Sequence, residues 1–250
     1  MVEKTLSLHK IGFSQKHFFY LFVLKELKLG NQYIAEMYQK LQDTFPTKQY
    51  TRSQFYRVVK EMDESLNWIE PIPTKGNKTL YSLTEDGSFK LDNYYSTFYS
   101  NYSFLLATCE RFLHKNNQTS PFNLSNEQQR YFSKLINVKE LLCYFILRHL
   151  ARNRRRYYGS EIRQELKRLY GWQSSEGYLY DVIHEMEERL LIEGQWEDLE
   201  RRKRKYFHIT EQGIKSLSNI EQNISQKLLQ IRQFLLDMIR LFQDKIGLTP

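Results

Sequence analysis

Two clusters of arginine and lysine are the residues of this 250-residue sequence with the clearest chemical use. Guanidinium and ammonium groups donate charge-assisted hydrogen bonds to phosphate oxygens. The formal net charge of +8 at pH 7 agrees with a polyanionic partner, although charge alone does not define a fold. Solvated surface is the alternative interpretation of such runs. The candidate phosphate contacts are Arg154, Arg155, Arg156, Arg202, Lys203, Arg204 and Lys205.

A further set of polar residues has the spacing of one helix face after Thr51, which with Gln54 forms a capping box. The opposite face is apolar, so the polar face is expected at the surface. Arg and Gln near the start of a helix in the major groove can pair with guanine and adenine edges. A solvated face without a ligand is the alternative. The candidates are Arg52, Ser53, Gln54, Arg57 and Lys60, and Lys75 and Lys78 follow in a predicted hairpin turn.

A second helix of this kind is predicted near residues 176–188, with a different polar face. Glu176, Glu185 and Glu188 make it acidic, which discourages close approach of phosphates. Whether this helix reads bases therefore stays open, and a half-buried packing role is equally compatible with its tyrosine. The candidate DNA contacts here are Ser174, Ser175, Tyr178 and His184, with Tyr158 beside the first basic cluster.

Residue patterns of enzymes and metal sites are missing from the sequence. The six histidines do not group with Cys or carboxylates at metal-ligand spacing, and no glycine-rich phosphate loop or nucleophile elbow is present. We therefore expect no enzymatic activity, metal or cofactor. Cys109 and Cys143 lie in apolar stretches and are expected as reduced, buried thiols. With no signal pattern and no long apolar run, we expect a cytoplasmic protein without a membrane partner.

The sequence repeats itself, which predicts its architecture. Residues 179–187 (Leu-Tyr-Asp-Val-Ile-His-Glu-Met-Glu) follow residues 55–63 (Phe-Tyr-Arg-Val-Val-Lys-Glu-Met-Asp) at an offset of 124 with the same amphipathic stripe. Residues 207–213 then match residues 81–87 at an offset of 126. Two blocks kept in order at nearly one offset indicate an internal duplication.

Each copy predicts three helices, a two-stranded hairpin and a long trailing helix. The hairpins are expected at residues 68–73 with 79–83 and at 191–196 with 205–209, and the trailing helices at 88–114 and 214–245. Residues 127–136 are expected to extend the first helix of copy two, at 138–152, backward. The predicted fold is mainly α with small β-hairpins. It comprises two tandem winged helix-turn-helix domains with trailing helices (1–115 and 127–250), joined by a linker at 116–126 into a pseudo-dimer.

The second copy resembles the PadR family of bacterial winged-helix regulators over about residues 138–217. The resemblance is carried by residues 158–162 (Tyr-Gly-Ser-Glu-Ile), 177–180 (Gly-Tyr-Leu-Tyr), 187–194, 202–206 and 209–213. The first copy lacks the Tyr-Gly pair. Its segments 11–24 and 55–57 are also similar to the bacterial replication terminator protein. Both resemblances imply DNA binding and dimerisation through the trailing helix.

Three functions are therefore considered. The first is a sequence-specific double-stranded DNA binder, a transcriptional regulator (repressor), that reads two unequal half-sites through the third helix of each copy with basic wings on the phosphates. The second keeps DNA binding but serves replication termination, or plasmid or phage replication and segregation. The third is a protein-interaction module with degenerate winged helices. A homodimer through the trailing helices is left open, and no residue singles out a pocket for a small-molecule effector.

Overall fold

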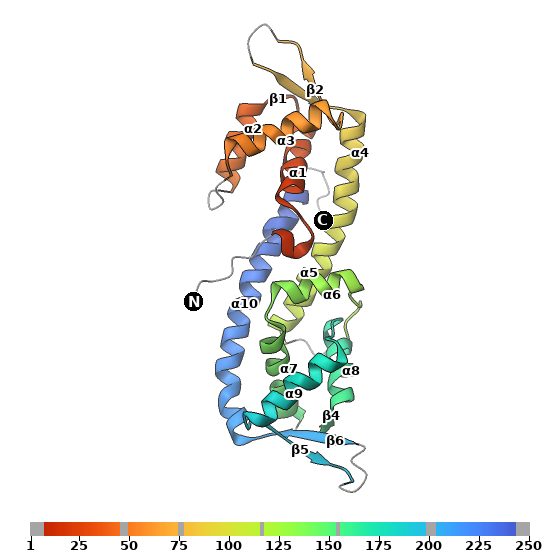
Figure 1. Ribbon diagram of the computed structural model, residues 1–250, viewed down its shortest axis with the longest axis vertical. Coiled ribbons are helices and arrows are strands. Elements are labelled where there is room, and N and C mark those ends of the chain that lie inside the picture. The colour runs from red at the N-terminus through yellow and green to blue at the C-terminus, as the bar shows by residue number, and fades with distance from the viewer. Residues whose placement is uncertain are drawn as a thin grey trace. The chain divides into compact units, whose positions relative to one another are not determined.

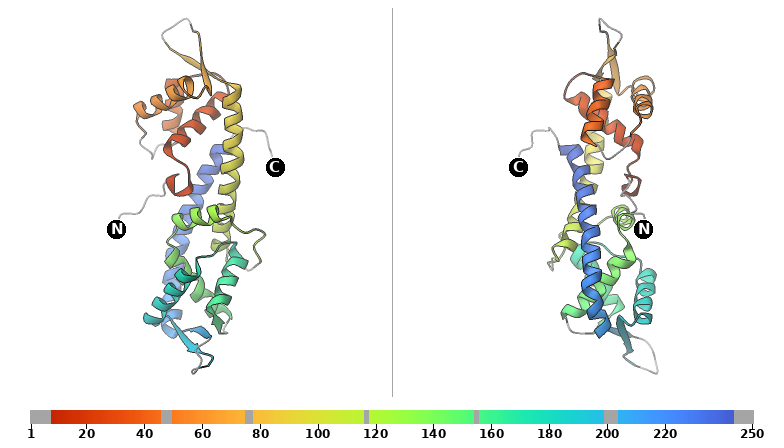
Figure 2. Two further views of the ribbon diagram at one scale, coloured as in Figure 1. Left: turned by 45° about the vertical axis from the view of Figure 1, so that its right-hand side comes forward. Right: turned by 90° about the vertical axis from the view of Figure 1, so that its left-hand side faces the viewer.

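The computed structural model describes residues 8–45, 50–74, 78–115, 118–153, 156–198 and 204–243. It is mostly helical with two small antiparallel sheets, as expected for winged helices (Figures 1 and 2). The chain divides into two compact units. The N-terminal unit consists mainly of Ser7–Asn101 and the C-terminal unit mainly of Tyr102–Met238. The division falls inside the first trailing helix, earlier than the boundary predicted at residue 115.

The N-terminal unit begins with four helical segments around a short strand and ends with a hairpin and a helix. Its elements are η1 (Leu8–Ile11), α1 (Gln15–Lys28), β1 (Gln32–Tyr33), α2 (Ile34–Thr44), α3 (Arg52–Glu64), β2 (Ile69–Ile72), β3 (Leu80–Leu83), α4 (Glu85–Tyr94) and the π-helical η2 (Tyr95–Tyr99). The sheet is antiparallel with the order β1-β3-β2. Pro71 lies in the edge strand β2, where a missing N–H is tolerated.

Helices α1, α3 and α4 of the N-terminal unit start where a hydroxyl side chain caps them. The side chains of Ser14, Thr51 and Thr84 accept hydrogen bonds from backbone N–H groups in the first turns of α1, α3 and α4. Helix α1 is apolar on nearly all sides, and every residue from 18 to 24 is buried. It therefore forms the centre of this unit's core, and α3 packs on it with only its apolar stripe.

The C-terminal unit has the same succession of elements, preceded by two further helices. Its elements are α5 (Ser100–Leu113), α6 (Asn126–Leu135), α7 (Val138–Asn153), β4 (Tyr157–Tyr158), α8 (Gly159–Tyr170), α9 (Glu176–Glu188), β5 (Ile192–Trp196), β6 (Lys205–Ile209) and α10 (Glu211–Gln243). Its sheet is antiparallel with the order β4-β6-β5. Each sheet thus contains a short third strand, β1 or β4, that the sequence patterns did not predict.

Three other features differ from the expectations. Helix α6 is separate from α7 because Ile136, which follows α6, has an extended backbone. A capping box of Ser125 and Gln128 begins α6. The first trailing helix contains the π-helical turn η2 between α4 and α5. The predicted linker is partly ordered on the C-terminal unit, since the N–H groups of Ser120 and Leu124 donate to the carbonyls of Arg168 and Gly171.

Candidate nucleic-acid interface

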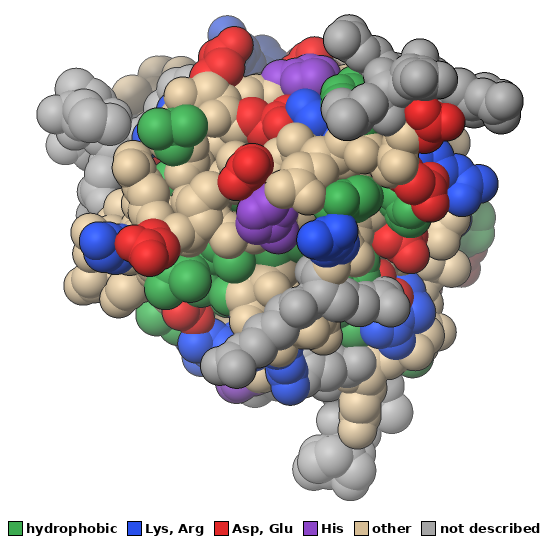
Figure 3. Space-filling model, turned by 90° about the horizontal axis from the view of Figure 1, so that it is seen from below, with side chains coloured by type: hydrophobic (Ala, Val, Ile, Leu, Met, Phe, Trp, Pro, Cys, Tyr) green, Lys and Arg blue, Asp and Glu red, His purple; other side chains and the backbone are tan. Residues whose placement is uncertain are grey.

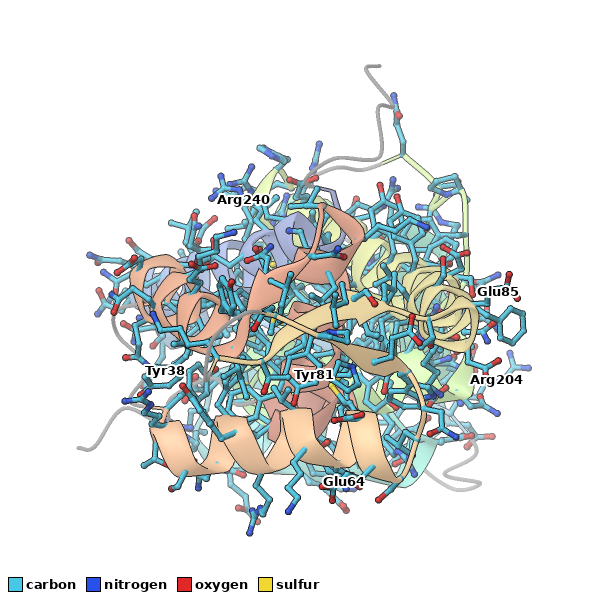
Figure 4. The ribbon with its side chains drawn as sticks, turned by 90° about the horizontal axis from the view of Figure 1, so that it is seen from above. Tyr38, Glu64, Tyr81, Glu85, Arg204 and Arg240 are labelled. Atoms are coloured by element: carbon cyan, nitrogen blue, oxygen red, sulfur yellow. The ribbon has the colours of Figure 1, made fainter. Side chains whose placement is uncertain are left out.

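Helix α3 presents its predicted polar face to solvent. Its apolar stripe, Phe55, Val58, Val59 and Met62, is at most 6% exposed. The view from above shows side chains of α3 projecting away from the unit, and Tyr81 lies on the opposite side of the helix, toward the rest of the unit (Figure 4). The helix is thus held by one face and offers the other to a ligand. The five predicted residues, Arg52, Ser53, Gln54, Arg57 and Lys60, are all exposed.

The cations of α3 differ in how strongly the protein holds them. The Arg52 guanidinium donates to the Tyr56 hydroxyl at 2.9 Å and lies 4.9 Å from the centre of its ring. The Lys60 ammonium lies 3.4 Å from the carboxylate of Glu64, an exposed pair that contributes little. Arg57 forms no ion pair among the described residues. Arg57 is therefore the most available cation on this face.

A groove of about 700 Å³ runs beside α3, between this helix, the start of α2 and the β2–β3 hairpin, which is the wing of the unit. No side chain caps the first turn of α2, so its N–H groups are open to an anion. Burial, and then the nearby Asp63, raises the pKa of Tyr81, which keeps that hydroxyl neutral. The lining residues are Tyr33, Ile34, Ala35, Arg52, Tyr56, Arg57, Lys60, Asp63, Glu64, Lys78, Thr79 and Tyr81.

The groove shows which site residues the sequence interpretation missed. The exposed Lys78 was predicted, and its backbone carbonyl accepts from Thr74 Oγ1 at 2.6 Å. Tyr33, Tyr56 and Tyr81 were not. The alternation along β3 could have identified Tyr81, because residues two apart lie on the same face of a strand. No comparable signal marked Tyr33, since the two-residue strand β1 is too short to show a pattern.

Helix α9 offers much less to DNA. Between Glu176 and Glu188 it carries five carboxylates and no lysine or arginine, whereas α3 carries three cations and three carboxylates. Ser175 caps the helix by accepting from the N–H of Tyr178. Tyr178 is 39% exposed. The exposed His184 places Nδ1 3.6 Å from a carboxylate oxygen of Glu187.

The expected exposure of Ser174 was wrong. This side chain is buried, and its hydroxyl has no hydrogen-bond partner in the described part of the chain. The reason is that Ser175 takes the capping position, which turns the preceding residue toward the interior. Ser174 is thus out of reach of a ligand on the α9 surface.

Lys205 also differs from its expected role as a phosphate contact. Its ammonium lies 2.6 and 2.8 Å from the two carboxylate oxygens of Glu187, and only 22% of its side chain is exposed. The rings of Trp196 and Phe207 cover it, with centres 5.8 and 5.6 Å away. The physical reason is strand alternation, which places Lys205 on the inner face of β6 with Phe207. The ion pair neutralises the charge expected to meet a phosphate.

The outer face of the same sheet holds two predicted arginines. Arg156 donates to the Tyr206 hydroxyl at 2.7 Å, and its guanidinium lies 4.5 Å from that ring centre. The Arg204 guanidinium lies 5.9 Å from the ring centre of Tyr158. Both arginines are exposed. The predicted residues Lys75, Arg154, Arg155, Arg202 and Lys203 lie outside the described residues.

The surface seen from below has no extended patch of one charge among the residues it describes (Figure 3). Acidic, basic and histidine side chains are intermixed there. On this face, individual side chains therefore decide where a phosphate could approach.

The described residues contain no group of histidines, cysteines and carboxylates that could hold a metal ion. Burial raises the pKa of Cys109 to about 12 and that of Cys143 to about 11, so both thiols stay protonated near neutral pH. In the described part of the chain, no helix has the length and apolar character needed to cross a membrane.

The comparison with known families identifies one part of the chain. Residues 146–219, from within α7 to within α10, match the transcriptional regulator PadR-like family. The sequence matches none of the curated proteins with which it was compared. The match contains β4, α8, α9 and the β5–β6 hairpin, which together form the winged-helix part of the C-terminal unit. Residues 146–219 are therefore a PadR-like domain, the type of domain found in DNA-binding transcriptional regulators.

Proposed function

We propose that this protein binds double-stranded DNA sequence-specifically as a transcriptional regulator, with its two units on two unequal half-sites. The observation that carries the proposal is the exposed polar face of α3 beside a basic groove, in a chain that also contains a PadR-like domain. Helix α3 would enter the major groove, where Gln54 and Arg57 can reach base edges. The adjacent groove would receive one phosphodiester strand.

The two half-sites are unequal in this proposal because the third helices differ in charge. Helix α3 can approach DNA with Arg57 free of an ion pair in the described structure. Helix α9 would bring the exposed carboxylates of Glu176, Asp181 and Glu188 toward the phosphates. Base preference should therefore be strong on one side of the bound site and weak on the other.

We also propose that the chain is a pseudo-dimer. The succession helix, short strand, two helices, hairpin and helix occurs twice, which supports an internal duplication. The two trailing helices meet inside the C-terminal unit: Cys109 Sγ of α5 donates to the carbonyl of Leu228 in α10, and Arg232 pairs with Glu110 at 3.2 Å. Helix α10 thereby has a packing partner in its own chain. A 30.4 kDa monomer in sedimentation equilibrium, bound one to one on a duplex, is the expected result.

The decisive experiment is selection of bound sequences from random duplexes, followed by affinity measurements on the selected site. Arg57→Ala should weaken binding between roughly fivefold and 150-fold and relax the preference at one base pair. The matched control is Lys134→Ala, an exposed cation of α6 without an ion pair among the described residues, which should bind like the wild type. Failure to enrich any sequence would contradict specific recognition.

The acidic α9 supports one other candidate, a protein-interaction module. This candidate predicts little affinity for any duplex at physiological salt, and an unchanged result with Arg57→Ala. The same measurements therefore distinguish it from the regulator.

A further inference from the structure

In the PadR-like domain, the third helix α9 is acidic, whereas the sheet carries exposed arginines beside tyrosine rings. In α9, the carboxylates of Glu176 and Glu188 are exposed and form no ion pair in the described residues. Glu187 holds Lys205, and Glu185 pairs with Lys139 at 2.5 Å and with Arg189 at 3.7 Å, so these cations are already bound to carboxylates of the helix. Close approach of α9 to phosphates would therefore meet uncompensated negative charge.

Strand alternation places a different set of side chains on the outer face of the sheet. Tyr157 and Phe207 are paired in register and buried, so they form the inner face. Their neighbours Tyr158 and Tyr206 are also paired in register and face the opposite side. Gln195 of β5 pairs with Tyr206 and shares that side. This outer face is accessible because neither tyrosine is buried.

Each tyrosine holds one arginine, and we call these four residues (Arg156, Tyr158, Arg204 and Tyr206) the Arg–Tyr face. The Tyr206 hydroxyl accepts from Arg156 at 2.7 Å and donates to Gln195 Oε1 at 2.9 Å. A guanidinium has five N–H donors in one plane, so stacking on a ring leaves most donors free at its edge. The Tyr206 ring and hydroxyl thus hold Arg156 before a ligand arrives, which reduces the entropy lost on binding, and the Tyr158 ring attracts Arg204 from a longer distance.

Two carboxylates share the outer side of the sheet. Glu193, near the first residue of β5, has a carboxylate oxygen 3.3 Å from Nε2 of His208. Glu197 lies near Tyr158, and the pKa of this tyrosine is raised first by partial loss of solvent around its hydroxyl and then by Glu197. Neither carboxylate forms an ion pair with Arg156 or Arg204 in the described residues. The two guanidiniums therefore keep their charge available for an external anion.

We propose that the Arg–Tyr face, and not α9, is the surface by which the PadR-like domain contacts DNA, as a clamp on backbone phosphates without base preference. This inference rests on the proposed DNA-binding function. Tyr158 and Tyr206 act as positioning residues for the two arginines. The clamp explains how a domain with an acidic third helix can contribute to binding, and why one half-site should lack base preference.

The test uses the full chain, the selected duplex and a duplex of scrambled sequence, with affinities measured from 50 to 200 mM salt. Arg156→Ala with Arg204→Ala should weaken binding to both duplexes by the same factor. Because each phosphate contact contributes about 0.9 to the slope of log affinity against log salt, the slope should become shallower by about 1.8. The ratio of wild-type affinity to variant affinity should then fall about twelvefold between 50 and 200 mM salt. Lys134→Ala should change neither quantity.

Variants of the positioning residue and of α9 separate the alternatives. Tyr206→Phe keeps the ring but removes the hydroxyl that accepts from Arg156, so binding should weaken roughly two- to tenfold with an unchanged salt slope. Glu176→Gln with Glu188→Gln should leave affinity unchanged if α9 lies away from DNA. Markedly tighter binding of that double variant would place α9 against the phosphates and overturn the inference.

Failure of the clamp and failure of the proposed function give different results. If the wild type binds no duplex, the proposed function itself is wrong. If the wild type binds and the double arginine variant keeps the full salt slope with an unchanged melting temperature, only the clamp is wrong. If that variant loses affinity for the selected duplex alone, the Arg–Tyr face reads bases, which also contradicts a clamp.

Discussion

The ion pair between Lys205 and Glu187 allows a direct test of the difference between a structural cation and a DNA contact. The pair joins the wing strand β6 to α9, with both oxygens of Glu187 within 2.8 Å of the ammonium. Replacing Lys205 with Met keeps an unbranched apolar stem, one atom shorter, against Trp196 and Phe207. It removes the charge and leaves the Glu187 carboxylate, 19% exposed, without its partner.

The expected cost follows from how far the pair is buried. Breaking a fully buried pair costs about 3–5 kcal/mol, whereas an exposed pair contributes about 0–1 kcal/mol. The side chains of Lys205 and Glu187 are 22% and 19% exposed. We therefore expect Lys205→Met to lower the free energy of unfolding by about 2 kcal/mol, equivalent to about 4–8 °C in the melting temperature. The charge removed should not alter the salt dependence of DNA binding, because this charge is already neutralised.

Thermal unfolding and salt-dependent DNA titrations measure the two quantities. In a double-mutant cycle, Lys205→Met with Glu187→Met should be less destabilised than the sum of the single variants, since no unpaired charge remains. Lys134→Met controls for loss of an exposed lysine. The reasoning is refuted if Lys205→Met melts like the wild type and instead makes the salt slope shallower by about 0.9, the value for one phosphate contact.

Two further predictions concern stability. Gly194→Ala should lower the melting temperature, because the new Cβ would lie 2.3 Å from Lys205 Cε and 2.4 Å from Glu187 Oε1. Gly177→Ala in α9 meets nothing within 4 Å and should stabilise the protein by about 0.5–1 kcal/mol. Equal effects of the two variants in thermal melts would contradict the geometry. Burial, and then two nearby lysines, lower the pKa of His17 from 6.5, so the unfolded chain takes up this proton first and stability should fall as the pH drops below about 6.5. His17→Gln should flatten the loss of melting temperature between pH 7.5 and 5.5, unlike the exposed control His184→Gln, and an unchanged profile would count against this assignment.

The helices could be predicted from the sequence because their signals are local. The stripe of Phe55, Val58, Val59 and Met62 predicts both the helix and its buried face, and the cap at Thr51 predicts its start. The PadR-like segment was recognised from short motifs whose order and spacing are fixed. The exposed face of α3 followed directly, since it is the complement of a buried stripe.

Other features depend on contacts between distant residues, which local patterns do not contain. The strands β1 and β4 exist because β3 and β6 pair with them, and two residues are too few to show alternation. Lys205 lies in a basic run in the sequence, yet its position in the strand directs it inward to Glu187 on α9. A charge run therefore does not define which of its members face solvent once it enters a strand.

Under the proposed function, the contrast between α3 and α9 limits the kind of DNA site that this chain should recognise. In a symmetric dimer both reading helices are identical, so the preferred site is a palindrome. Here the two third helices carry different charges, and two exposed arginines of the PadR-like domain, Arg156 and Arg204, lie on its sheet. A palindromic site would present the same bases to two surfaces, of which, in the proposed function, only α3 reads them. The selected site should accordingly have one conserved half, flanked by a segment whose sequence is free but whose phosphates are required.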